Sequence, residues 1–105
     1  MTNETLETIK SRRSCRAYKP EQITDEELNA VLEAGTYAAS AMGRQSAKIV
    51  VVQDAATRAQ LTRMNAAVMG TNNDPMYAAP TILVVLADAN SKNAVQDGSL
   101  VMGNL

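Results

Sequence analysis

Half of the positive charge in this chain lies in one short stretch near its start. Residues 10–20 read KSRRSCRAYKP and hold five of the ten lysine and arginine residues, although the formal net charge is -1. Three of the five are arginines, whose planar guanidinium groups suit paired hydrogen bonds to phosphate oxygens. If the stretch is extended, alternation sends Ser14 and Arg16 to one face, about 6–7 Å apart. This spacing favours a site for one phosphate with a hydroxylated chain beside it.

A purely structural interpretation of the cluster is also open. Lys10, Arg12 and Arg13 would stand in the last turn of a helix predicted over residues 3–12, where cations stabilise the helix dipole. A second polar feature favours a ligand instead. Arg44 and Gln45 follow Gly43 in a predicted loop that lies before an apolar strand. Loops at strand ends often carry binding residues.

The composition excludes several kinds of chemistry. The chain has no histidine and a single cysteine, Cys15, which excludes Ser-His or Cys-His catalysis and cysteine- or histidine-based zinc sites within it. It contains neither G-x-G-x-x-G nor G-x-x-x-x-G-K-[ST], so a phosphate would be held by side chains. The chain has only three tyrosines as aromatic residues, which argues against a nucleic-acid or phosphate-binding module. We therefore favour a protein whose chemistry is supplied by a cofactor or a partner and keep the binding module as the alternative.

Hydrophobic periodicity predicts one domain over residues 1–105 with alternating elements. A capping box at Thr24 and Glu27 begins a helix over residues 25–38, and Asp54 and Gly70 bound another. The latter helix would present Leu61, Met64 and Val68 as its apolar face and leave Arg58 exposed. Apolar strands are predicted over 49–52 and 81–86, and a last helix from about residue 94. Strand–helix–strand order alone favours a parallel βαβ unit.

The start of the chain resembles the FMN-dependent nitroreductase family. The resemblance rests on the pattern E-x-I-K-x-R-R-S-x-R, made by Glu7, Ile9, Lys10, Arg12, Arg13, Ser14 and Arg16. The later segments EAGTYA (33–38), AAPTILVVLAD (78–88) and DGSLVMGNL (97–105) also look like that family. The resemblance implies an α+β fold in which helices pack on a central, largely antiparallel sheet, in place of the parallel unit. It also implies a homodimer with flavin at the subunit interface.

The same resemblance implies roles for six residues. Arg12, Ser14 and Arg16 would contact the phosphate and ribityl chain of FMN, and Arg13 would contribute its backbone. Many relatives read N-x-Q-P where this chain reads Gly43-Arg44-Gln45-Ser46. Gln45 is therefore expected to contact the flavin or its ribityl chain, and Gly43 is carried over by position only. No catalytic residue and no metal ligand are assigned.

The implied function is reduction of nitro compounds, quinones or similar small-molecule acceptors by FMN, with NADH or NADPH as electron donor. We expect a cytoplasmic protein that neither crosses a membrane nor binds nucleic acid, because the sequence has no signal-peptide pattern and no long apolar run. The run Leu100–Leu105 stops without a helix-ending signal. We therefore expect these residues to be the N-terminal part of the fold, incomplete at the C-terminus. By this interpretation, the isolated chain binds FMN weakly or not at all. A non-catalytic fragment of a longer chain is the other alternative.

Overall fold

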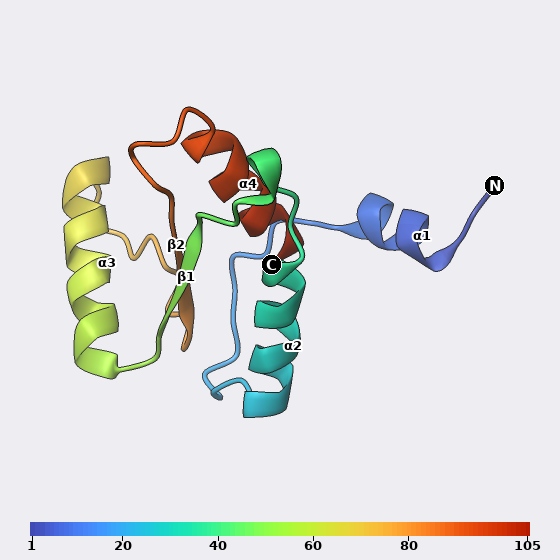
Figure 1. Cartoon of the computed structure of the whole chain (residues 1–105). Coiled ribbons are helices and arrows are strands. Elements are labelled where there is room, and N and C mark those ends of the chain that lie inside the picture. The colour runs from blue at the N-terminus through green and yellow to red at the C-terminus, as the bar shows by residue number, and fades with distance from the viewer.

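The computed structural model describes residues 1–105 and contains four α-helices, one 3-10 turn and two strands (Figure 1). In chain order these are α1 (Glu4–Ser11), α2 (Asp25–Thr36), the 3-10 turn (Ala41–Gly43), β1 (Lys48–Val52), α3 (Ala55–Met69), β2 (Ile82–Leu86) and α4 (Ala94–Asn104). All the elements predicted from the sequence are present, with ends shifted by one or two residues. None of the helices combines the length and apolar composition needed to span a membrane.

The helix ends follow from local hydrogen bonds. At α2 the Thr24 hydroxyl accepts from the Glu27 amide at 3.2 Å, and the Glu27 carboxylate accepts from the Thr24 amide at 3.1 Å. These reciprocal bonds confirm the predicted capping box. Asp54 caps α3 by accepting a hydrogen bond from the Thr57 amide at 2.8 Å, and Gly70 ends that helix with φ at 65°.

The two strands form an antiparallel pair in which Lys48 lies opposite Leu86 and Val52 opposite Ile82. The strand–helix–strand order alone had predicted a parallel βαβ unit, and that prediction is wrong. The antiparallel sheet implied by the family resemblance is confirmed. The physical reason lies in the connection. The 15-residue helix α3 carries the chain about 22 Å, and residues 70–81 bring it back, so β2 begins at the end of the sheet where β1 stops (Figure 1).

The helices lie on both sides of this two-stranded sheet. Helices α2 and α4 pack against each other and α4 packs against β2, whereas α3 lies on the opposite side (Figure 1). The packing of α2 is closest at Gly35, where an added Cβ would stand 2.6 Å from Leu105 and 2.8 Å from Ile49. These contacts, together with the antiparallel pairing of β1 and β2, confirm the α+β architecture.

The fold buries little of its own surface. Only four of the 105 residues are buried, and Ile82 is the one large apolar side chain among them. The radius of gyration is 15.5 Å, compared with about 13 Å for a compact domain of this length. The apolar face predicted on α3 is left open, because Met64 is 58% exposed and Val68 87% exposed. The chain therefore presents large apolar faces that another surface could cover.

Candidate functional site

The predicted phosphate-binding residues lie in an exposed segment between α1 and α2. Arg12, Arg13, Ser14 and Arg16 are all exposed, and α1 projects away from the rest of the molecule (Figure 1). Only Arg13 uses its guanidinium group within the chain: NH1 donates to the carbonyl oxygens of Lys10 at 3.0 Å and Arg12 at 2.8 Å. Arg13 therefore caps the C-terminal end of α1, which is the structural role foreseen for part of the cluster.

The remaining groups of this arginine segment (residues 12–16) suit an anion. The guanidinium groups of Arg12 and Arg16 and the hydroxyl of Ser14 are exposed and donate no hydrogen bond inside the chain. Between them, the Cys15 thiol donates to the Ala17 carbonyl at 3.1 Å. This bond gives Cys15 a local structural role. The segment thus offers two uncommitted cations and one hydroxyl to solvent or to a ligand.

A polar network anchors the chain just after this segment. Gln22 donates through Nε2 to the Pro80 carbonyl at 2.9 Å and accepts a hydrogen bond from the Thr81 hydroxyl. Thr81 in turn accepts from Gln53 Nε2 at 3.0 Å. The network connects the segment before α2 with the end of the sheet where β1 stops and β2 begins. Sequence reasoning missed it, because its members are separated by up to 59 residues and carry no local pattern.

The second predicted region, the polar loop (residues 40–46), has an unusual backbone. Met42, Gly43 and Gln45 all have positive φ, at 55°, 64° and 48°. Glycine and asparagine adopt this left-handed conformation more easily than other residues. Glycine at position 43 therefore suits the left-handed backbone of this loop. Non-glycine residues held in this region often mark functional loops.

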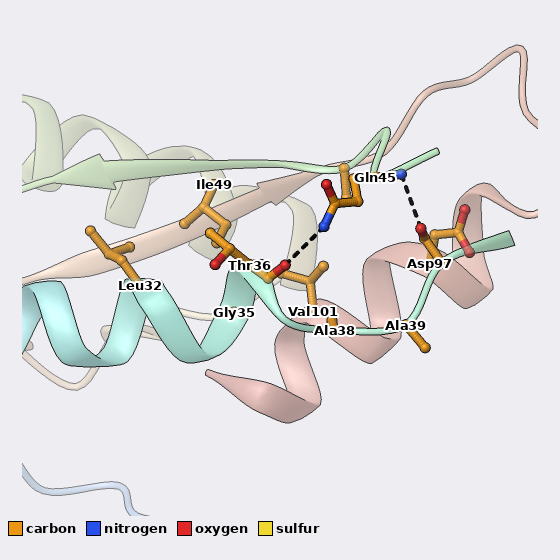
Figure 2. A pocket seen from close by; sticks show the side chains of 11 residues that line it. Leu32, Gly35, Thr36, Ala38, Ala39, Gln45, Ile49, Asp97 and Val101 are labelled. Carbon is orange, nitrogen blue, oxygen red and sulfur yellow. Dashed lines mark hydrogen bonds between the residues drawn. The ribbon is translucent and has the colours of Figure 1, made fainter. Parts of the chain in front are cut away.

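Gln45 closes the polar loop onto α2. Its Nε2 donates to the Thr36 carbonyl at 3.1 Å, and its backbone amide donates to the Ser40 hydroxyl at 3.0 Å (Figure 2). The side chain also lines a cavity of about 390 Å³ between the C-terminal end of α2, the start of β1 and α4. The cavity wall is largely apolar, with Gln45, Thr36, Ser40 and Asp97 as its polar members.

The structure does not join the two predicted regions in one cavity. Gln45 lines the cavity, whereas Gly43 and the arginine segment are not part of its wall. Asp97, which the sequence analysis left unassigned, lies in that wall and is only 4% exposed. No group of three or more acidic or cysteine side chains is placed to hold a metal ion. What the chain offers is an exposed basic segment and, separately, a fixed polar loop beside a small cavity.

The sequence profile of the nitroreductase family matches residues 9–104. The chain belongs to this family. Among solved structures, a nitroreductase from Bacteroides fragilis NCTC 9343 with bound FMN is 34% identical, with a TM-score of 0.84 over 98% of this chain and 62% of that one. An FMN-bound nitroreductase from Desulfitobacterium hafniense DCB-2 is 30% identical, with a TM-score of 0.86 over 99% of this chain and 63% of that one.

This nitroreductase-family chain is shorter than the relatives it matches. A Bacillus subtilis protein named as an FMN reductase that uses NAD(P)H is 28% identical over 97 residues, which are 90% of this chain and 36% of that protein. A second Bacillus subtilis relative is matched over 44% of its length. The chain thus spans less than half of these curated relatives and about three fifths of the two FMN-bound structures.

Proposed function

We propose that the protein is an FMN-dependent oxidoreductase that takes electrons from NADH or NADPH and passes them to nitro compounds, quinones or similar acceptors. The observation that carries this proposal is the arginine segment, in which Arg12, Ser14 and Arg16 are exposed and uncommitted. A side-chain phosphate site of this kind suits a mononucleotide, because the chain lacks a dinucleotide-binding glycine motif. Family membership and two similar FMN-bound structures support the choice of flavin.

The donor set of the arginine segment fits the phosphate end of FMN. Arg12 and Arg16 would neutralise the phosphate with charge-assisted hydrogen bonds, and Ser14 would donate to a phosphate or ribityl oxygen. Arg13 would contribute only its backbone amide, since its NH1 group already binds two carbonyl oxygens at the end of α1. Lysine would replace these arginines poorly, because it lacks the planar fork.

The polar loop would contact another part of the cofactor. Gln45 has one amide proton committed to Thr36, which leaves its Oε1 and second proton for a flavin or ribityl group. At Gly43 no atom lies within 4 Å of the position that a Cβ would take, so a ligand could approach the backbone there closely. Both residues lie on a backbone fixed by hydrogen bonds, which suits a role in orientation.

When bound, FMN supplies the hydride chemistry of this reaction. The protein's own part is to bind the phosphate, orient the ring system and limit access of water. We propose a homodimer in the cytoplasm as the working form. This assembly is supported by the apolar residues left open on α3 and α4, such as Val68 and Val95, and by the separation of the arginine segment from the Gln45 cavity. A second subunit would cover the apolar faces and complete the flavin site.

Identification of the bound cofactor tests the proposal most directly. The purified full-length protein should be yellow, and denaturation should release FMN, not FAD. Addition of NADH or NADPH should bleach the flavin spectrum, and a nitroaromatic or quinone should restore it. FAD in the released fraction, or no flavin uptake after reconstitution, would contradict the proposal. If the segment serves nucleic acid instead, affinity for oligonucleotides should be high and fall steeply with salt.

A further inference from the structure

Asp97 stands out because it is the one charged side chain that the fold buries. It is 4% exposed and lies in the first turn of α4. The following residue, Gly98, packs against β2: an added Cβ there would lie 3.6 Å from the Cβ of Ala87. A carboxylate is almost never buried without a hydrogen-bonding partner. The start of α4 therefore holds this group in a fixed place for a reason that packing alone does not supply.

The partner of Asp97 lies in the polar loop. Its Oδ1 accepts a hydrogen bond from the backbone amide of Ala41 at 3.0 Å, across 56 residues of sequence. Ala41 begins the 3-10 turn that leads into the positive-φ residues Met42 and Gly43. At the other end of the loop Gln45 is held by Ser40 and Thr36. Asp97 thus provides the one hydrogen bond that fixes this loop to α4.

We propose that Asp97 is a positioning residue for the flavin-contacting loop. Its carboxylate holds the Ala41 amide, and through it keeps Gly43 and Gln45 in the left-handed conformations in which they would meet the flavin. A left-handed conformation is costly for residues other than glycine and persists only where the surroundings impose it. The inference rests on the proposed function, since it assigns the loop to FMN. Its first part, the control of the loop by Asp97, does not depend on any ligand.

Three substitutions separate the position of the acceptor from its charge. Asp97→Ala removes both, and we expect hydrogen exchange of the Ala41 amide to accelerate at least tenfold and FMN affinity to fall about tenfold. Asp97→Asn keeps an oxygen at the same distance, although it accepts a weaker bond, so exchange and affinity should stay within about threefold of the wild type. Asp97→Glu keeps the charge near the helix N-terminus but displaces the acceptor, and should resemble Asp97→Ala. Asp88→Ala is the matched control, because the Asp88 carboxylate accepts a hydrogen bond only from the amide of nearby Asn90.

The measurements are NMR-detected exchange at Ala41 and FMN titration of the whole protein. An unchanged exchange rate in Asp97→Ala, or a Glu variant that behaves like wild type while the Asn variant does not, would overturn the positioning role. Faster exchange with unchanged FMN affinity would overturn the link between the loop and the flavin. A wild-type protein that takes up no FMN would contradict the proposed function, and the exchange rates would still decide whether Asp97 holds the loop.

Discussion

The N-terminal arm (residues 1–16) and the polar loop (residues 40–46) are held in opposite ways. Every hydrogen bond of the arm joins residues at most four positions apart, as in the bond from the Leu6 amide to Asn3. The polar loop is fixed by Asp97 from another helix, across 56 residues. The predicted flavin contacts therefore divide between a charged arm that the rest of the chain does not hold and a polar loop that it does hold.

This difference suggests a division of labour in binding. A ligand that orders the arm must offset conformational entropy of about 1–2 kcal/mol for each backbone residue that it fixes. Two charge-assisted contacts to a phosphate, at about 1.5–3 kcal/mol each, together offset the ordering of about three residues. The loop contributes less attraction, but its backbone is already in place, so its contacts cost little further ordering. We infer that the arm supplies affinity and the loop supplies orientation.

The largest expected effect is on FMN affinity when the arm loses a cation. Arg12→Ala or Arg16→Ala should weaken FMN binding about 10- to 100-fold, since about 1.4 kcal/mol corresponds to a factor of ten. Arg12→Lys should recover only part of the loss, because the paired hydrogen bonds are not restored. Titration of the flavin-free protein with FMN, followed by flavin fluorescence, measures the change.

The control for these variants is Arg63→Ala, because Arg63 is exposed on α3. Arg58 is unsuitable, and the prediction of its exposure is wrong. Its Nε donates to the Gln53 carbonyl at 3.1 Å and its Nη1 to the Ala79 carbonyl at 3.3 Å. Its removal would therefore disturb the segments next to β1 and β2. If Arg63→Ala weakens FMN binding as much as Arg12→Ala does, the arm is not the phosphate site.

The contrast between arm and body also explains what sequence reasoning could reach. The cap at Thr24 and the stop at Gly70 depend on neighbours within a few residues, and both were predicted. Arg58, Asp97 and Gln22 depend on partners at least five residues away and in most cases more than twenty, and none of these contacts was foreseen. The direction of β2 likewise followed from the course of residues 70–81, which leaves no periodic signal.

A smaller effect is expected from two glycines that lie in the packed body. Gly35→Ala would place a Cβ within 3 Å of Leu105 and Ile49, and overpacking of this kind costs about 1–3 kcal/mol. Alanine recovers up to about 1 kcal/mol of helix preference, and both clashing atoms are side-chain ends that can turn. We therefore expect a net loss near the lower limit, about 1 kcal/mol.

Gly98→Ala is the matched comparison, since its added Cβ would lie at 3.6 Å, an ordinary contact. This variant keeps the helix preference without the clash and should be stabilised by about 0.5–1 kcal/mol. Denaturant unfolding of both variants measures the two changes. A Gly35→Ala variant that is stabilised as well would show that the contact between α2, α4 and β1 is looser than the structure has it.

The smallest effect concerns the charge at the start of α2. Hydrogen bonds from the Thr24 amide and then from its hydroxyl lower the pKa of Glu27 below the usual 4.5, and the nearby cation Lys19 contributes least. Because the folded pKa is depressed, the stabilisation is complete above pH 4.5 and is lost as pH falls through the lower, folded value. Lys19→Ala should leave the Glu27 titration, followed by NMR, almost unchanged. Glu27→Gln should be less stable than wild type at pH 7, and this difference should shrink as the pH falls below 4.5 and through the lower pKa of the folded carboxylate. A difference that persists at pH 3 would assign the cap to side-chain shape and not to charge.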